Sequence, residues 1–516
     1  MPDSKNGSPP SNLPNVYAVH GAEPEVQAYA MAKYSRSALS MKESLKEINE
    51  QKAEKFLNTF YFQYGHRSIA DLAHIAFAIE RLSILAAIVL VDEQRWDGQE
   101  RSTRYQDFKK SGYYTPDFGE DEESRRLYRE TIEFLFSEYE QISELMWRYL
   151  AERTPKPDDM KPEAYERTLR ARAFDISRYL LPLATNTSLG EIVNARTLES
   201  QISRLLSHTH AEVRGLGDLL KQAAGEPAYN VNQGSWRELV EQIQRFNPEL
   251  GQKADSLLFK EVRVSPTLVK YAEASQYEIS TRRELAQAAR ELMKDALIEP
   301  TKPVELLEDD PLEIELATTL LYQHSHYPYR QIRQRVEALT SHQREEIVDL
   351  GVKHRGRHDE LLRAYCSGQR FRFDILMDVG GFRDMHRHRR CVQIMQPFAG
   401  TLHGYDTPDD LHRAGLQKRY DSVMQRIHAA ETRLRTAPAE DASHYVVPLA
   451  FRWRTLFKMD FAEALYIAEL RTTPAGHFSY RNVAHSMYEE VAKRYPTLAR
   501  HFRVSNVQEP VDLLKR

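Results

Sequence analysis

The chain has 516 residues, of which 41% are hydrophobic and 28% are charged, with 71 Lys and Arg against 75 Asp and Glu. This composition is typical of a folded globular protein and excludes an intrinsically disordered, collagen-like or disulfide-stapled chain. The net charge of −4 excludes attachment to nucleic acid or anionic lipid by bulk charge, so we expect no nucleic-acid partner.

The ends and the apolar runs of the chain predict its environment. Residues 1–15 are rich in Pro, Ser and Asn, which favours a disordered tail without a signal peptide. The longest apolar run, 84–91, is far shorter than the roughly 20 residues of a membrane-spanning helix and predicts a buried core helix. Two cysteines, Cys366 and Cys391, cannot form a disulfide framework. We therefore expect a soluble, cytoplasmic protein without a membrane partner.

Hydrophobic spacing predicts a helix-rich chain. Weak alternation at 16–19 favours a short strand, whereas apolar residues recur with helical spacing in nine segments. These segments are 25–48, 69–90, 123–150, 167–181, 198–223, 313–321, 331–348, 461–470 and 480–494. Turn signals at Gly225-Glu226-Pro227, Asn247-Pro248 and 299–303 delimit a helical connector over 226–302.

An ordered series of short matches indicates an internal repeat. Thr115-Pro116-Asp117 recurs as Thr407-Pro408-Asp409, and Leu181-Pro182-Leu183 recurs as Val447-Pro448-Leu449. Arg204, after an apolar helical stretch, is matched by Arg471. The series predicts two related halves, 16–225 and 303–516. The number of residues that separates a segment from its match is smaller for the second match than for the first. The first half is therefore expected to carry an insert near 124–157.

Two polar clusters of the first half could bind a ligand. In Glu100-Arg101-Ser102-Thr103-Arg104-Tyr105, alternate side chains would share one face if the segment is extended, and Arg pairs bidentately with phosphate. A solvated charged loop is the alternative. The second cluster consists of Arg178, Asn194, Arg196 and Arg204, of which the last two are spaced to line one helical groove. Its alternative is an ordinary helix surface.

The second half carries Arg387-His388-Arg389-Arg390 after Gly380-Gly381. A nucleotide diphosphate would neutralise this run, and a plain basic surface is the alternative. His354 and His358, with His386 and His388, have no acidic or Cys ligand at a telling spacing, so no metal site is predicted. Cys391 is expected to be a small buried hydrophobe rather than an activated thiolate.

Together these motifs resemble the flavin-dependent thymidylate synthase family, present twice. The first half carries the family's motifs in order, with most of their spacings. They are Gly65-His66-Arg67-Ser68, Phe77-Ala78-Ile79-Glu80 (which the family pattern makes an apolar helix), Gln99 to Tyr105, Arg178-Tyr179-Leu180-Leu181-Pro182, Asn194-Ala195-Arg196 and His210-Ala211-Glu212-Val213-Arg214. The resemblance implies a helix-rich α+β fold, with two tandem copies of an antiparallel sheet flanked by helices.

The two halves have lost different parts of the family pattern. The family's Arg-His-Arg falls on Asp92-Glu93-Gln94 in the first half, whereas the second half keeps Arg387-His388-Arg389. The family's Glu, Ser and Arg are Glu100, Ser102 and Arg104 in the first half and fall on Met395, Pro397 and Ala399 in the second. The Arg before Leu-Pro, Arg178 in the first half, becomes His444 in the second, which keeps Arg471.

Because family members are homotetramers with sites between subunits, the resemblance implies one composite site joining both halves, and a homodimer that mimics the tetramer. The roles that it implies are as follows: catalytic residues Ser102, Arg104 and Arg387; nucleotide-binding residues Glu100, Ser102, Arg104, Arg178, Arg204 and Arg471; flavin contacts His66, Ser68, Asn194, Arg196, Arg387, His388 and Arg389.

The reaction implied by the resemblance is reductive C5 methylation of dUMP to dTMP. Methylenetetrahydrofolate supplies the carbon, and FAD reduced by NADPH supplies the hydride. Two alternatives stay open. The first is the same chemistry on another uridine nucleotide such as UMP. The second is a non-catalytic nucleotide-binding or assembly protein, motivated by the carboxylates of Asp92 and Glu93 at a phosphate-binding position.

Overall fold

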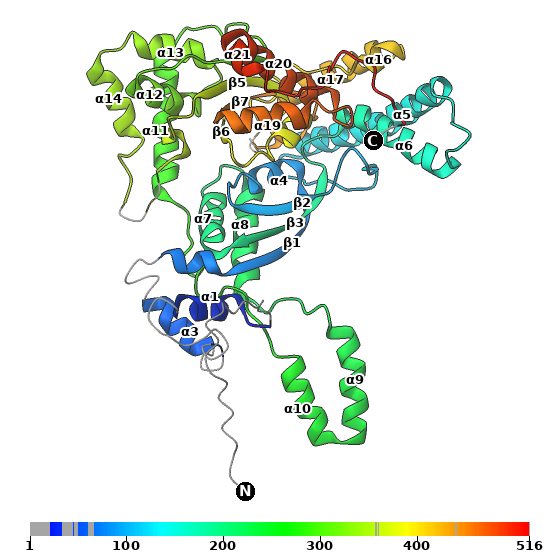
Figure 1. The fold of residues 1–516 in the computed structure, drawn as a ribbon, viewed down its shortest axis with the longest axis vertical. Coiled ribbons are helices and arrows are strands. Elements are labelled where there is room, and N and C mark those ends of the chain that lie inside the picture. The colour runs from blue at the N-terminus through cyan, green and yellow to red at the C-terminus, as the bar shows by residue number, and fades with distance from the viewer. Residues whose placement is uncertain are drawn as a thin grey trace. The chain divides into compact units, whose positions relative to one another are not determined.

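The structure is a computed structural model that describes residues 21–33, 45, 50–59, 67–356, 359, 361–437, 439 and 441–514. The expected tail over 1–15, the strand at 16–19, His66 and His358 lie outside these residues. The chain packs as two compact units (Figure 1). Unit 1 comprises residues 1–75, 194–199 and 220–271, and unit 2 comprises residues 76–193, 200–219 and 272–516.

Unit 1 is helical. It contains α1 (Pro24–Ala32), α3 (Glu50–Leu57), η3 (Arg67–Leu72), α9 (Gln233–Phe246) and α10 (Pro248–Leu258). Asn247 ends α9 and caps α10, because its side chain accepts from the Leu250 amide at 3.0 Å and Pro248 occupies the first turn. The buried Glu25 carboxylate ties α1 to the connector by accepting from the amides of Thr267 (2.9 Å) and Leu268 (2.8 Å).

The strand order of the first sheet recurs in the second, which has one additional strand, β4, at its edge. The first has the order β1-β3-β2, formed by β1 (His74–Ser83), β2 (Trp96–Glu100) and β3 (Asn186–Asn194). The second has the order β4-β5-β7-β6, formed by β4 (Val304–Leu306), β5 (Phe371–Asp378), β6 (Val392–Met395) and β7 (Arg452–Met459). The strands β2 and β3, β4 and β5, β5 and β7, and β6 and β7 pair antiparallel. The antiparallel α+β fold expected for both halves is confirmed.

Helices recur around both sheets in the same order. The first half has α4 (Ile84–Leu90), α5 (Glu122–Arg153), α6 (Pro162–Ser177), η4 (Arg178–Leu180), α7 (Ala195–Leu206) and α8 (Ala211–Gly225). The second half has α15 (Val379–Met385), α16 (Asp409–Arg413), α17 (Gln417–Leu434), α18 (Ala442–Tyr445), α19 (Phe461–Arg471), α20 (Phe478–Arg494) and α21 (Pro496–Ala499). The expected insert is visible as a longer α5, of 32 residues against 18 in α17.

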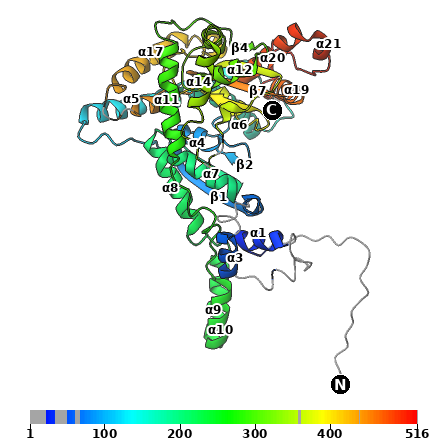
Figure 2. The ribbon, with the colours of Figure 1, turned by 90° about the vertical axis from the view of Figure 1, so that its left-hand side faces the viewer.

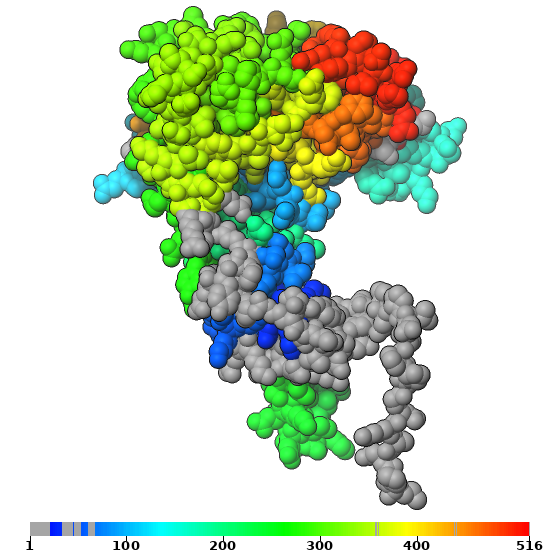
Figure 3. Space-filling view, turned by 60° about the vertical axis from the view of Figure 1, so that its left-hand side comes forward, coloured from blue at the N-terminus to red at the C-terminus, as the bar shows by residue number. Residues whose placement is uncertain are grey.

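Further helices precede the second sheet. They are α11 (Gln276–Leu292), α12 (Leu312–Tyr322), α13 (Tyr329–Glu337), α14 (Ser341–Leu350) and η5 (Arg363–Tyr365). Tyr322 at the end of α12 anchors this group, because its hydroxyl donates to Asp374 of β5 at 2.8 Å. In the space-filling view the second half forms one continuous surface, coloured yellow-green to red (Figure 3). Among the described residues, no helix has the length and apolarity needed to cross a membrane.

The two halves join within the chain through a symmetric backbone contact. The Leu183 amide donates to the Val447 carbonyl (2.9 Å), and the Leu449 amide donates to the Leu181 carbonyl (3.0 Å). These residues flank the repeated prolines, so each half contributes the same two groups. Beside this joint α17 lies along α5, where Arg419 donates to both carboxylate oxygens of Glu138 at 2.7 and 2.9 Å (Figure 2).

Three predicted helices differ from the structure. The segment 69–90 is not one helix, because β1 occupies His74–Ser83 between η3 and α4. The Phe77-Ala78-Ile79-Glu80 motif therefore lies on a strand. Arg81 has a φ of 62°, which interrupts the alternation of the strand and obscured its period of two. The segments 198–223 and 331–348 are each split into two helices, and the second split is fixed by a capping box at Thr340.

Gly98 of β2 should not tolerate a side chain. A Cβ at this position would overlap the Trp96 ring and the Gly190 carbonyl oxygen on β3. Gly98→Ala is therefore expected to destabilise the protein by about 1–3 kcal/mol, the usual effect of overpacking. The thermal unfolding midpoint measures it. Gly190→Ala is the matched control, because its Cβ would be 3.8 Å from the nearest atom, and an equal midpoint for both variants would contradict the prediction.

Candidate functional site

A small cavity lies where β2 and α4 of the first half meet the segment after α15 of the second half. Its volume is about 140 Å³, and it is lined by Ile88, Val91, Trp96, Gly98, Gln99, Glu100, Arg383, His386, Arg387 and Arg389. Ligand pockets commonly measure roughly 300–1,000 Å³, so this cavity has room for part of a nucleotide only. The structure thus places Glu100 of the first half and Arg387 of the second on one cavity.

Glu100, the last residue of β2, is held by groups from both halves. Its Oε1 accepts from the Thr187 hydroxyl on β3 at 3.2 Å and from Nη2 of Arg383 on α15. The other terminal nitrogen of Arg383 lies 3.5 Å from the Thr103 hydroxyl. Arg383 was not predicted from the sequence, and it joins the two halves at the cavity.

The three residues of the basic triplet have different surroundings. Arg387 is exposed on the cavity wall, whereas His388 is 5% exposed. Arg389 donates to the Trp96 carbonyl and to Asp97 Oδ1 (3.1 Å) of the first half. The alternative of a plain basic surface therefore fits Arg387 and Arg390 of the four-residue run, which are exposed, but not His388 or Arg389.

Arg104 is buried and bound almost completely by protein atoms. Its Nε and Nη2 donate to the two Asp175 oxygens at 2.9 and 3.2 Å. Its Nη1 donates to the Tyr480 hydroxyl at 3.0 Å, and its Nη2 also donates to the Ala475 carbonyl at 3.0 Å. The alternative of a solvated loop is therefore wrong for Arg104, which is 7% exposed. Residues 103–105 form a turn after β2, so the condition of an extended segment is not met there.

Asp175 on α6 is the centre of this charged group. Besides Arg104, it lies 3.6 Å from Arg178 Nε and 3.0 Å from His477 Nδ1. Burial opposes its ionisation, but His477, Arg104 and Arg178 hold the pKa of Asp175 well below its usual range. Burial, reinforced by the Arg178 charge, lowers the pKa of His477 to about 4, so this imidazole is neutral at pH 7. Asp175 is thus a buried carboxylate between two arginines.

Two nitrogens of the buried Arg178 guanidinium form no hydrogen bond to a described residue. The side chain is 2% exposed; Nη1 donates to the Thr103 hydroxyl at 3.4 Å, while Nε and Nη2 form no hydrogen bond to a described residue. Asp384 lies 3.8 Å from Nη1. A buried guanidinium with open donors fits an anionic ligand such as a phosphate, because unmet buried donors are costly.

Asp378 is a second buried carboxylate beside this guanidinium. It caps α15 by accepting from the Gly381 amide at 2.7 Å and also accepts from the Ser479 hydroxyl. Burial and the neighbouring Asp406 raise the pKa of Asp378 to about 6. A Cβ added at Gly380 would be 3.7 Å from Arg178 Nε, so a side chain at this position of α15 would contact Arg178.

Arg471 and His388 form a further part of the same group. Arg471 Nε donates to His388 Nε2 at 2.8 Å, so that nitrogen carries no proton, and His388 Nδ1 then donates to Glu463 at 3.1 Å. Burial keeps the pKa of His388 below its usual value. The Tyr480 ring lies between the guanidinium groups of Arg471 (5.4 Å) and Arg104 (5.7 Å). Arg104 of the first half and Arg471 of the second therefore share one aromatic ring.

Other predicted site residues have different partners. Arg204 donates to Glu93 at 2.9 Å, and Arg196, on the same helix, lies 3.4 Å from Asp71, so each arginine is paired with its own carboxylate. Asn194 caps α7 by accepting from the Thr197 amide at 2.8 Å. The Ser102 hydroxyl accepts from the Arg104 amide at 3.3 Å. Ser68 is exposed on η3.

Five residues of the site were missed by sequence reasoning. They are Asp175, Arg383, Glu463, His477 and Tyr480. Only Asp175 had a usable signal, because it stands three residues before Arg178 on a predicted helix and therefore on the same face. The other four lie in the second half, where the motifs are weakest.

The metal and thiol alternatives have no support in the described residues. No group of three or more His, Cys, Asp or Glu side chains there could hold a metal ion. His354 pairs with Glu284 at 2.7 Å, and His358 lies outside the described residues. Cys391 is 2% exposed, and burial raises the pKa of its thiol well above the usual value. The expectation of a buried, unactivated cysteine is confirmed.

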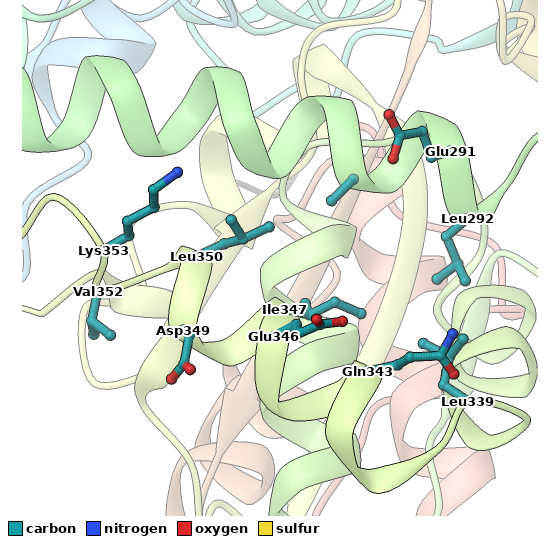
Figure 4. A pocket seen from close by; sticks show the side chains of 11 residues that line it. Glu291, Leu292, Leu339, Gln343, Glu346, Ile347, Asp349, Leu350, Val352 and Lys353 are labelled. Atoms are coloured by element: carbon teal, nitrogen blue, oxygen red, sulfur yellow. The ribbon is translucent and has the colours of Figure 1, made fainter.

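A larger hollow of about 800 Å³ lies elsewhere in unit 2, between α11 and α14 (Figure 4). Its lining includes the apolar side chains of Leu292, Ile347 and Leu350 and the carboxylates of Glu291 and Glu346. It contains none of the residues predicted for the site and no arginine. The charges that suit a nucleotide phosphate are at the smaller cavity.

Comparison with known proteins places the chain in a family. A family model described as thymidylate synthase complementing protein matches residues 17–226 and 304–497. A UPF0159 protein of Chlamydia pneumoniae is 28% identical over 520 residues, covering 95% of this chain and 91% of the relative. A flavin-dependent thymidylate synthase of Clostridium tetani is 28% identical over 211 residues, covering 40% of this chain and 80% of its own.

Two solved structures are also similar to part of the chain. One is ThyX of Helicobacter pylori complexed with FAD and dUMP, with 16% identity, a TM-score of 0.26, and coverage of 39% of this chain and 89% of that chain. The other is a UMP/dUMP methylase, PolB of Streptomyces cacaoi, with 18% identity, a TM-score of 0.29, and coverage of 39% and 84%. Because the family model matches most of the sequence in two successive segments, the chain belongs to the family of thymidylate synthase complementing proteins, the flavin-dependent thymidylate synthases.

Proposed function

We propose that the protein catalyses reductive C5 methylation of dUMP to dTMP at one composite site, built from Glu100, Ser102, Arg104 and Arg178 of the first half and Arg387, His388, Arg389 and Arg471 of the second. The observation that carries the proposal is the pair of open donors on the buried Arg178, which shares the Thr103 hydroxyl with Arg383 of the cavity lined by Glu100 and Arg387. An anionic nucleotide satisfies both features, because its phosphate accepts from arginine and its base offers polar edges to Glu100.

The residues of the chain would act by binding and polarising. Arg178 and Arg471 hold the phosphate, while Asp175 and Tyr480 fix Arg104 at its side. Positive charge from Arg387 near the uracil carbonyls would stabilise the negative charge that develops when C6 is attacked. No cysteine nucleophile is needed, in keeping with the buried thiol of Cys391.

The residues at the cavity fit the phosphates of a cofactor as well as those of a substrate. Arg387 and Arg389 would hold the phosphates of FAD. FAD reduced by NADPH supplies the hydride, and methylenetetrahydrofolate supplies the carbon. The cavity is too small for a whole nucleotide and its Arg387 side is exposed, so we propose that a second copy of the chain completes the site in a cytoplasmic homodimer.

Arg387→Ala provides the most direct test of the proposed function. Its side chain is exposed, so its removal leaves no buried charge unpaired and should not unfold the protein. We expect dTMP formation from dUMP, methylenetetrahydrofolate and NADPH to fall by about 100-fold or more, as when a transition-state charge donor is removed. Product formation is measured by mass spectrometry, together with flavin absorbance.

The matched control is Arg370→Ala, which removes an exposed arginine of the same half that pairs with Asp309 at 2.7 Å. It should retain full activity. Normal turnover in Arg387→Ala would contradict the composite site. The same assay with UMP in place of dUMP decides between the two nucleotides.

One observation favours the non-catalytic alternative. Arg104 donates four hydrogen bonds to Asp175, Tyr480 and Ala475, so most of its donors are already used within the protein. A protein that retained the fold as a nucleotide-binding or assembly module would keep such an arginine for stability. A colourless preparation that takes up no added FAD but binds dUMP would support this alternative.

A further inference from the structure

The segment Asp92-Glu93-Gln94 has the same place in the first half as Arg387-His388-Arg389 has in the second. The first segment lies between α4 and β2, and the second lies between α15 and β6. Because the halves are repeated, the composite cavity has a counterpart, which we call the second junction. The composite cavity has Arg387 and His388 of the second half, whereas the second junction has the carboxylates of Asp92 and Glu93 of the first half. The contacts of these carboxylates show what has replaced the ligand-binding charges.

Glu93 neutralises Arg204. Its Oε1 accepts from Arg204 Nε at 2.9 Å, and the rest of that guanidinium donates to the carbonyls of Val89 (2.9 Å) and Leu90 (3.3 Å). Arg204 corresponds to Arg471 of the second half, which donates to the neutral His388 instead. The same arginine is thus paired with a carboxylate at one junction and with an imidazole at the other.

Asp92 neutralises an arginine of the opposite half. Arg363 of η5 donates from Nη1 to Asp92 Oδ1 at 2.5 Å and from Nη2 to the Asp92 carbonyl at 3.0 Å. Burial opposes ionisation of Asp92, but Arg363, His386 and Arg204 hold its pKa below the usual range. The carboxylate is therefore charged, and a ligand phosphate placed here would meet its repulsion instead of an arginine.

The same ion pair supports the wall of the composite cavity. Arg363 Nη1 lies 3.3 Å from the Gln393 carbonyl, and the Gln393 side chain contacts His386 Nδ1 at 2.7 Å and donates to the His388 carbonyl at 3.1 Å. His386 Nε2 is 3.9 Å from Asp92. His386 lines the cavity immediately before Arg387, so the contacts of Asp92 extend to the triplet.

We propose that Asp92 and Glu93 neutralise Arg363 and Arg204 and so prevent a nucleotide from binding at the second junction, which leaves each chain with one nucleotide site. Asp92, through Arg363, also positions His386 and Arg387 on the wall of the composite cavity. This inference rests on the proposed function for the identity of the nucleotide. Asp92 is a positioning residue, because it reaches the cavity through Arg363, Gln393 and His386 and does not line it.

Binding of dUMP to the full-length protein, measured by calorimetry, tests both parts. We expect one dUMP per chain. Asp92→Asn should weaken dUMP binding by about 10- to 100-fold, the usual cost of misplacing a binding group, with the stoichiometry unchanged. Asp92→Glu should recover most of the affinity, which a merely structural role would not require. The control Asp309→Asn, at an exposed ion pair, should bind as the parent does.

Two dUMP molecules per chain would overturn the absence of nucleotide binding at the second junction, and parent-like affinity in Asp92→Asn would overturn the positioning role. A parent that binds no dUMP would contradict the proposed function instead. In that case the positioning role is decided by exposure of Arg387 to phenylglyoxal modification, read by mass spectrometry. Asp92→Asn should change the rate of Arg387 modification and Asp309→Asn should not, and equal rates would overturn the inference.

Discussion

Asp175→Asn is expected to destabilise the protein by about 3–5 kcal/mol, because removing one partner of a buried ion pair leaves the other charge uncompensated. Two arginines depend on this carboxylate. Arg104 donates to both of its oxygens, and Arg178 lies 3.6 Å away with a side chain that is 2% exposed. The asparagine keeps the shape and one acceptor, so the loss reports the charge. The midpoint of urea unfolding measures it.

Asp159→Asn is the control, since Asp159 is exposed between α5 and α6 and its replacement should leave the midpoint unchanged. Adding Arg104→Met to Asp175→Asn should recover part of the stability, because one of the stranded charges is removed. If Asp175→Asn unfolded at the same urea concentration as Asp159→Asn, the two arginines would not need this carboxylate.

Asp175 contacts both arginines but satisfies them to different extents. The charge of Arg104 is neutralised within its own half, and its remaining donors go to Tyr480 and Ala475 of the other half. Arg178 is left with unmet donors. In the proposed site Arg104 would therefore join the two halves, whereas Arg178 would offer its donors to the ligand.

The sequence predicted the repeated fold but not all of its elements. The apolar run at 84–91 became the buried helix α4, whose N-cap Ser83 accepts from the Ala86 amide at 2.9 Å. The strand before it was read as helix. Ile75, Phe77 and Ile79 alternate as a strand requires, but the left-handed conformation of Arg81 then places Leu82 and Ser83 together in the interior. A strand joined directly to a helix, as β1 is to α4, leaves no turn signal for sequence analysis to use.

The residues of the candidate site that lie within short sequence motifs could be predicted. The residues that join the site by pairing with side chains distant in the sequence could not. The arginines could be selected because motifs survive around them. Their partners could not, since Tyr480 and Ala475 are more than 370 positions from Arg104 and lie where the motif is degraded. The replacement of the first-half triplet was visible as a loss, but its pairing with Arg363 needed the structure.

The divergence of the two halves also preserves hydrogen bonds by exchanging their partners. In the first half Ser83 caps α4 and its hydroxyl donates to Glu212 of α8 at 2.6 Å. At the corresponding place in the second half Asp378 caps α15, and Ser479 of α20 donates to it. The hydroxyl is at the N-cap in the first half and on the partner helix in the second, and the carboxylate takes the other position in each half. The contact between the two helices is kept. Such exchange is expected when buried polar groups must stay paired.

Acidification from pH 7 to pH 5 is expected to destabilise the protein strongly. Burial lowers the pKa of six described histidines far below the ordinary value of 6.5. Their pKa values are about 4 for His210, His403, His444 and His477, about 3 for His324 and about 2 for His208. The unfolded chain binds protons at these residues between pH 6.5 and 4, and the folded chain does not. Their contribution to stability is therefore present above pH 6.5 and is lost as the pH falls.

Buried carboxyl groups whose pKa is raised, such as Glu25, Glu212 and Glu278, act in the opposite direction, and the effect is largest for two others. Burial raises the pKa of Glu191 to about 7 and that of Asp378 to about 6, so the folded state binds their protons first and gains stability on acidification. The six histidines outnumber these two in the window from pH 6.5 to 5. Each net proton changes the free energy of unfolding by about 1.4 kcal/mol per pH unit, so the fall amounts to several kcal/mol.

His444→Gln should reduce the pH dependence of the free energy of unfolding by the contribution of one titrating histidine. The His444 ring meets His210 at 3.0 Å between Nδ1 and Nε2, and glutamine supplies a polar group in its place without a titrating charge. Thermal midpoints at pH 7.0, 6.0 and 5.0 measure the slope. His342→Gln, at an exposed helix position, should leave the slope as in the parent. A midpoint that stayed constant from pH 7 to pH 5 in the parent would mean that the buried histidines are protonated in the folded protein.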